Sequence, residues 1–126
     1  MDGTMTDSDC GTIDHSALDR LVRFGGNKLV SDMIGIFIAD APGRIAGARA
    51  GVRADDAGAV ARALHALKSS AGQLGAHQMM ACCEAGEMLA NLGDTAALRA
   101  AVADVELAFA SVRSQLEVHA ATLRVA

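Results

Sequence analysis

The chain has 126 residues, which is enough for one domain with a substantial core but not for two. Hydrophobic residues make up 52% of it but aromatic residues only 2%, and alanine, leucine and valine supply most of the apolar surface. This composition favours closely packed helices over a β-sandwich, which is richer in β-branched and aromatic residues. The formal charge is −4 and no basic cluster is interleaved with aromatic residues, so nucleic acid is not an expected partner.

The sequence shows no recognisable targeting segment or membrane span. Residues 1–12 are polar and acidic, unlike a signal peptide, and without hydrophobic periodicity they are expected to form a flexible tail. The most apolar stretch, Met33 to Ala41, is too short to cross a bilayer and is interrupted by acidic residues. We therefore expect a cytoplasmic protein, without membrane association, whose folded domain covers residues 13–126.

The three cysteines do not indicate a metal site. Cys10 lies in the expected tail, while Cys82 and Cys83 are adjacent and poorly placed to bridge each other on a helix. A structural metal needs four ligands at suitable spacing, and His77 together with these thiols does not provide them. We expect no bound metal and reduced thiols that behave as small hydrophobic side chains.

A short helix is predicted to begin the folded domain. Asp14 is a good N-cap, and Ile13 before it and Leu18 after it have the spacing of a hydrophobic staple. The pair Gly25 and Gly26 is typical of a helix C-terminus, so this helix is expected to end there.

The second predicted helix extends from Asn27 to about Val52. Pro42 lies within it and removes one backbone hydrogen bond, so we expect a kink at that residue. The apolar residues of this helix recur at spacings of three and four; they are Val30, Ile34, Phe37, Ala41, Ile45, Ala48 and Val52.

Three more helices follow along the chain. Asp55 is the expected cap of the third helix and Gly75 marks the turn after it, while Asn91 to Asp94 combine a stop with a new cap. The apolar seam of the third helix comprises Val60, Leu64, Leu67, Ala71 and Leu74. The inward side of the fourth comprises Met79, Cys82, Cys83, Gly86 and Leu89. The last helix has the heptad-like series Leu98, Val102, Val105, Phe109, Val112, Leu116, His119 and Leu123.

The helices and their short connections define the expected fold class. It is all-α, an up-and-down antiparallel four-helix bundle with a short additional N-terminal helix packed across one end. Because the packed faces leave no large exposed apolar stripe, we expect a monomer.

His65 lies on the third helix, roughly opposite the middle of its apolar seam at about 100° per residue. Its own face carries Ala61 one turn before it, Lys68 and Ser69 one turn after it, and Gly72 two turns after it. A neutral imidazole is a nucleophile near neutral pH and can accept a phosphoryl group, whose charge a lysine can offset. An exposed histidine is more often simply solvated, so this face by itself leaves both interpretations open.

The run HALKSSAGQLGA, His65 to Ala76, resembles the signature of histidine-containing phosphotransfer (HPt) domains. The segments LDRLVRFGG and FIADAP, the Cys83–Glu84 pair and the Gly-Asp before the last helix are also similar to that family. The resemblance therefore covers most of the chain. The positions that match the signature itself are His65, Leu67, Lys68, Ser69, Ser70, Leu74, Gly75 and Ala76.

This resemblance implies a four-helix bundle that relays phosphoryl groups between receiver-domain aspartates and His65 in a multistep two-component phosphorelay. Lys68 would stabilise the charge of the phosphoryl group, and Ala61, Ser69 and Gly72 would contribute to a receiver-docking face. The implied partners are response-regulator receiver domains and a hybrid sensor histidine kinase. The domain would be a phosphoryl carrier rather than an enzyme, with no cofactor of its own, because the receiver would supply Mg²⁺.

Glu87 occupies the position on the fourth helix where many HPt domains carry a glutamine that hydrogen-bonds the histidine or the phosphoryl group. A carboxylate can orient an imidazole but repels a phosphoryl group. A role at the docking face and a solvated surface position therefore remain equal alternatives for Glu87. His15, His77 and His119 have no lysine and small residues arranged on their faces, and they are expected to be structural or solvated.

Other functional classes fit the sequence less well. A scaffolding bundle, or an HPt-like domain that binds receivers without transfer, would not need the pair of His65 and Lys68. A kinase or phosphatase would need a nucleotide or metal site, and GGNK at Gly25 lacks the P-loop spacing. The dimerisation domain of a sensor kinase usually has an acidic residue directly after its histidine, where this chain has Ala66.

Overall fold

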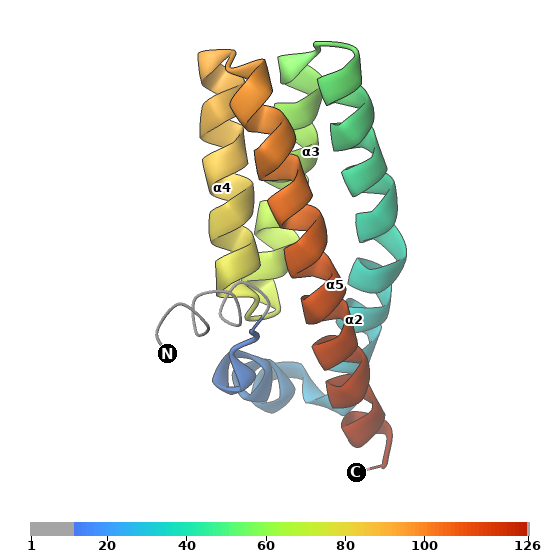
Figure 1. The fold of residues 1–126 in the computed structure, drawn as a ribbon. Coiled ribbons are helices and arrows are strands. Elements are labelled where there is room, and N and C mark those ends of the chain that lie inside the picture. Colours follow the sequence, from blue (N-terminus) through green and yellow to red (C-terminus); the bar gives the residue numbers. More distant parts are fainter. Residues whose placement is uncertain (1–11, 126) are drawn as a thin grey trace, which may run out of the picture.

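The computed structural model describes residues 12–125, so the expected N-terminal tail lies outside the described residues except for Thr12. The described residues form four helices and no strand. They are α2 (His15–Arg53), α3 (Ala57–Gln73), α4 (His77–Leu92) and α5 (Thr95–Val125). The long helices stand side by side as a bundle, and the first part of α2 lies across its lower end (Figure 1). The predicted all-α four-helix bundle with an additional N-terminal helix is therefore confirmed.

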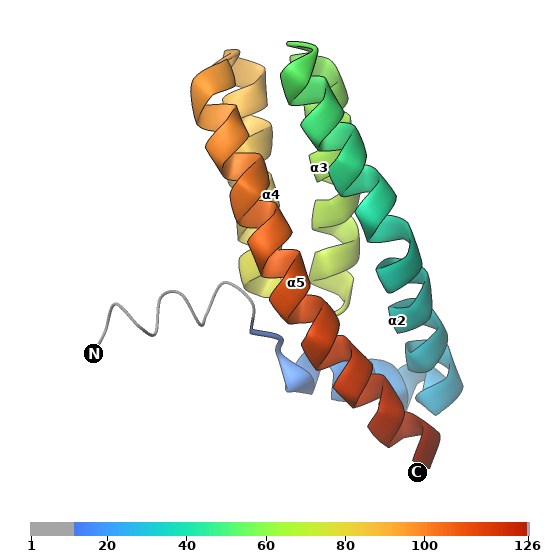
Figure 2. The same ribbon diagram turned by 45° about the vertical axis from the view of Figure 1, so that its right-hand side comes forward.

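Neighbours in the chain are neighbours in the bundle. Helix α2 packs against α3 and α5, and α4 packs against α3 and α5, so the four helices form a square in cross-section. The loops that join them are short, and successive helices run in opposite directions (Figures 1 and 2). No helix among the described residues is long and apolar enough to span a membrane.

Helix α2 consists of two parts that meet at Gly26. Gly26 has φ +87° and ψ 171°, which is non-helical, so the backbone turns sharply between a short N-terminal arm (residues 15–25) and a long limb (residues 27–53). The predicted start of the arm is confirmed, because the Asp14 carboxylate accepts a hydrogen bond from the Ser16 backbone N–H. The staple residues Ile13 and Leu18 are both buried. The prediction that the first helical segment ends at Gly25 and Gly26 is therefore confirmed.

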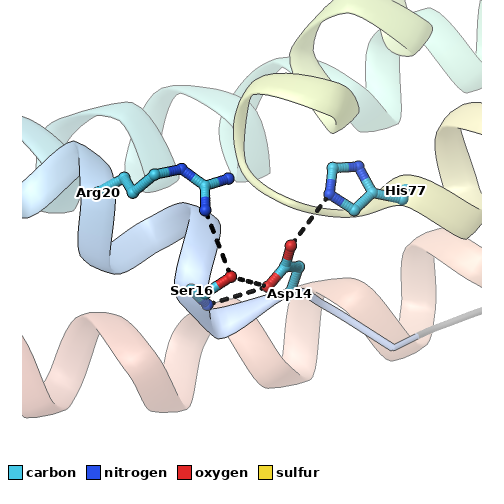
Figure 3. Close-up of polar contacts among 4 residues, drawn as sticks. All are labelled: Asp14, Ser16, Arg20 and His77. Atoms are coloured by element: carbon cyan, nitrogen blue, oxygen red, sulfur yellow. Dashed lines mark hydrogen bonds and ion pairs between the residues drawn. The ribbon is translucent and has the colours of Figure 1, made fainter.

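The N-terminal arm is attached to the turn between α3 and α4. The Asp14 N–H donates to the Gly75 carbonyl at 2.8 Å, and the Asp14 carboxylate lies 3.3 Å from His77 Nε2 (Figure 3). Gly75 has φ +81°, and a Cβ there would lie 2.7 Å from the Asp14 carbonyl oxygen. The turn therefore needs glycine both for its left-handed backbone and for the close approach of the arm.

The long limb of α2 buries the whole predicted seam, from Val30 to Val52. The helix continues through Pro42 with helical dihedral angles, and Gly26 is the residue whose angles are non-helical. The kink in α2 is therefore at Gly26 and not at Pro42, where the lost backbone hydrogen bond leaves the dihedral angles helical.

The loop between α2 and α3 differs from the prediction in its cap. Asp56, not Asp55, is the N-cap of α3, and its carboxylate accepts from the Ala59 N–H at 3.1 Å. Asp55 has a left-handed backbone, with φ 55°, and accepts a hydrogen bond from the Thr95 hydroxyl at 2.8 Å. The prediction of Asp55 was wrong because a contact with the start of α5, far along the chain, decides which of two adjacent aspartates faces the helix.

The predicted seams of α3 and α5 are buried, apart from the C-terminal end of α5, where His119 and Leu123 are half-buried. Across the core, the rings of Phe37 and Phe109 meet edge to face, with centroids 5.6 Å apart. The inward side of α4 was partly misassigned, since Cys82 and Leu89 are only half-buried. The residues of α4 that the bundle does bury are Met79, Cys83, Gly86 and Ala90.

Candidate functional site

The outer face of α3 presents His65 to solvent. The neighbouring residue Leu64 and the next seam residue Leu67 are buried, and the helical period then directs the His65 side chain outward, where it is 64% exposed. The histidine thus lies off the apolar seam, as the sequence predicts.

Close packing of α3 against α4 brings a carboxylate to this histidine. A Cβ on Gly86 would lie only 2.5 Å from Leu64 Cδ1, so the absence of a side chain at Gly86 lets the two helices approach. The next residue, Glu87, then faces the surface side of α3. Its Oε2 lies 3.1 Å from His65 Nδ1, and its Oε1 lies 2.8 Å from Lys68 Nζ. One carboxylate therefore joins the histidine and the lysine.

The carboxylate determines which ring nitrogen of His65 is available for reaction. An ionised carboxylate only accepts hydrogen bonds, so the proton of a neutral imidazole must be on Nδ1 when that atom contacts Glu87. The lone pair is then on Nε2, which has no hydrogen bond or ion pair with any described residue. The exposed nitrogen is consequently the nucleophilic one.

The charges of Glu87 and Lys68 stabilise each other. The close ion pair with Lys68 lowers the pKa of Glu87 below its ordinary 4.5, and the contact with His65 lowers it further, whereas burial opposes both. The same carboxylate raises the pKa of Lys68 above its ordinary 10.5. Both groups are thus ionised near neutral pH, and their side chains are only 18% and 26% exposed, respectively.

The small residues around His65 are unequally accessible. Ser69 is exposed, and its hydroxyl donates to the His65 carbonyl at 3.4 Å. Ala61 and Gly72 are half-buried, and Met80 from α4 lies over Gly72, with Sδ 2.7 Å from the position of a Cβ there. The sequence gives no signal for this role of Met80 other than its place beside the buried Met79.

The other histidines lie away from this face. His77 pairs with Asp14 at the N-terminal arm, and His15 lies against His119, with ring centroids 5.4 Å apart. Burial, followed by the charge of His15, lowers the pKa of His119 below its ordinary 6.5.

Among the described residues, the cysteines and acidic side chains do not converge on a metal-binding geometry. Cys82 and Cys83 form no disulfide, and burial raises the pKa of Cys83 to about 12, which keeps that thiol protonated. In the part of the chain from residue 12 to residue 125, no three His, Cys, Asp or Glu side chains are grouped to hold a metal ion.

The structure thus defines a helical bundle that displays an exposed imidazole next to a lysine, both in contact with one carboxylate. The sequence model of the Hpt domain family matches residues 32–121. This match covers most of the chain and includes the whole site, so the chain belongs to the Hpt domain family, the histidine phosphotransfer domains of two-component signalling.

The fold is also that of a solved phosphotransfer protein. The chain is similar to the crystal structure of histidine-containing phosphotransfer protein B (HptB) from Pseudomonas aeruginosa PAO1, with a TM-score of 0.82 and 23% sequence identity. The similarity covers 87% of this chain and 95% of the other. A search of curated protein sequences found no significant match.

Proposed function

We propose that His65 accepts a phosphoryl group from the aspartyl phosphate of a receiver domain and passes it to the aspartate of a second receiver. The observation that carries this proposal is the exposed imidazole with Nδ1 held by Glu87, because it leaves the Nε2 lone pair available at the surface. In transfer, Nε2 attacks phosphorus and the P–O bond to the receiver aspartate breaks, with its electron pair returning to the carboxylate. The ring then carries a positive charge, which Glu87 offsets.

Lys68 and the small residues complete the proposed site. Lys68 lies on the same face one turn after His65, where its ammonium reduces the repulsion between the phosphoryl oxygens and the protein. Ala61, Ser69 and Gly72 provide a low surface over which receiver loops reach His65. Glu87 is mostly covered, so it contributes to this docking face through His65 and Lys68 rather than through its own surface.

In this proposal the domain is a phosphoryl carrier and not a kinase. The receiver contributes the acyl phosphate and Mg²⁺, and a hybrid sensor kinase supplies the phosphoryl group upstream. The domain acts in the cytoplasm as a monomer. ATP alone should therefore leave it unlabelled, and labelling by ATP without a kinase and receiver would refute this assignment.

The test is label transfer from a phosphorylated receiver to the wild type, His65→Gln and the control His77→Gln. We expect the wild type and His77→Gln to be labelled and His65→Gln to be unlabelled while remaining folded. The bond should be labile in acid and persist in base, as expected for a phosphoramidate. Full labelling of His65→Gln would place the acceptor elsewhere, and a wild type that binds receivers but is never labelled would indicate a docking function only.

A further inference from the structure

The lysine that would stabilise a phosphoryl group on His65 is already paired with a carboxylate in the unphosphorylated protein. Lys68 Nζ lies 2.8 Å from Glu87 Oε1, and among the described residues Lys68 forms an ion pair with Glu87 alone. Glu84, which like Glu87 lies on α4, interacts with Lys68 only through a weaker, longer-range attraction between the two charges. A phosphoryl group on His65 would therefore find Lys68 already in an ion pair, because the largely covered Glu87 carboxylate offsets its charge.

We propose that Glu87 lowers the stability of phosphorylated His65 by competing with the phosphoryl group for Lys68, and so biases the domain towards donating its phosphoryl group. This inference rests on the proposed function, because it concerns the equilibrium of that same transfer. Glu87 is here a positioning residue, which acts on the phosphoryl group through His65 and Lys68.

The physical basis is a count of charges before and after transfer. Before transfer, the Glu87 carboxylate and the Lys68 ammonium form a neutral pair beside a neutral imidazole. After transfer, a phosphoryl group with about two negative charges is attached to Nε2 and the ring that keeps its Nδ1 proton is positive, so the side chain has gained about one net negative charge near Glu87. Lys68 must then share its donors between the carboxylate and the phosphoryl oxygens. The repulsion between the two anions remains, because Glu87 is too covered for water to screen it fully.

The same contact has a second consequence, for the bond itself. A carboxylate next to Nδ1 favours a proton on that atom, and a phosphohistidine with a protonated ring has a better leaving group. The competition for Lys68 lowers the equilibrium amount of phosphorylated His65, and the proton on Nδ1 increases the rate at which the phosphoryl group is lost to an acceptor. Glu87 therefore favours turnover of the phosphorylated form over its accumulation.

The experiment measures the equilibrium between one receiver, phosphorylated with acetyl phosphate and Mg²⁺, and each variant of the full chain. Removing the charge in Glu87→Gln should shift the equilibrium towards phosphorylated His65 by about tenfold. Glu87→Asp keeps the charge and should stay within about twofold of wild type. The control Glu106→Gln removes a carboxylate from an interhelical ion pair with Arg49, between α2 and α5, and should also behave like wild type.

An equilibrium constant separates this role from a merely structural one. A poorly oriented imidazole slows transfer in both directions but does not displace the final ratio of the two phosphorylated proteins. An unchanged or lowered fraction of phosphorylated His65 in Glu87→Gln would overturn the inference. So would a rise in Glu87→Asp as large as that in Glu87→Gln, since charge would then not be the cause.

A second arm needs no receiver and so distinguishes the two proposals. Potassium phosphoramidate phosphorylates histidine chemically, and the lifetime of the product can be followed by phosphorus NMR after the reagent is removed. We expect a longer lifetime in Glu87→Gln than in wild type, Glu87→Asp or Glu106→Gln. If receivers never label the wild type, the phosphorelay proposal fails, and this arm still decides whether Glu87 destabilises phosphohistidine. Equal lifetimes in all four proteins would refute that.

Discussion

Met80 covers Gly72, with its Sδ 2.7 Å from the point that a Cβ on Gly72 would occupy. A flexible thioether from α4 thus fills the gap that the sequence of α3 leaves two turns after His65. Methionine has three rotatable side-chain bonds and moves aside at low cost. The proposed docking face is therefore adaptable, and its shape at Gly72 depends on a residue from the neighbouring helix.

Gly72→Gln should leave the bundle folded but reduce transfer. The new side chain displaces the flexible end of Met80 rather than backbone, and glycine is a poorer helix former than glutamine by roughly 0.5–1 kcal/mol, so the loss of stability should be small. The larger side chain would hold receiver loops away from His65, and we expect transfer to fall by about 100-fold. Transfer kinetics and a thermal melt measure the two effects.

Gly72→Ala is the matched control for this substitution. It displaces Met80 in the same way but adds only a methyl group to the surface. Its transfer rate should remain close to that of wild type, and equal transfer by Gly72→Gln and Gly72→Ala would show that receivers do not dock over this part of α3.

Lys68→Ala should slow transfer by about tenfold without abolishing labelling, because the lysine stabilises charge and forms no bond to phosphorus. It should also raise the pKa of Glu87, which the Lys68 contact lowers in the wild type. Carbon NMR of the Glu87 carboxyl group measures this directly. Since pairing lowers the folded-state pKa, the stability from this pair is complete above the ordinary value of 4.5 and is lost as pH falls through the folded value. An unshifted Glu87 titration in Lys68→Ala would contradict the observed pairing.

Gly75→Ala should destabilise the fold by about 2 kcal/mol, because alanine is strained at positive φ and its Cβ would meet the Asp14 carbonyl. Chemical denaturation measures the free energy of unfolding. Gly93 is the matched control, since it also has positive φ, 73°, but open space around its Cβ position. Gly93→Ala should cost only the backbone strain, and an equal loss in both variants would show that the arm does not press on the turn.

Acid should weaken the contact between the N-terminal arm and α5 through His119. Its Nε2 is enclosed without a hydrogen-bond partner among residues 12–125, and burial and His15 lower the pKa of His119. The unfolded chain therefore binds a proton more readily, so stability is complete above the ordinary 6.5 and declines as pH falls below it. The melting temperature of wild type should drop more than that of His119→Leu between about pH 7.5 and about pH 5.5. If the melting temperatures of wild type and His119→Leu fall equally between these pH values, this role for His119 is excluded.

The sequence by itself determined the features that depend on the local period of the chain. The seam of the long limb, the seam of α3 and the cap at Asp14 follow from spacings within one helix, so they needed no knowledge of the neighbours. The outward position of His65 follows in the same way, because at about 100° per residue it lies roughly opposite the seam that includes Leu64 and Leu67.

Only the tertiary structure decided what surrounds His65. Sequence reasoning left Glu87 equally balanced between a functional and a solvated position, and it did not single out Met80. The choice between Asp55 and Asp56 as a cap also depended on Thr95, from another part of the chain. The physical reason is that the rotation and separation of α3 and α4 are set by packing between the two helices, including the close approach of Leu64 to Gly86. That spacing places one carboxylate within reach of both the imidazole and the lysine.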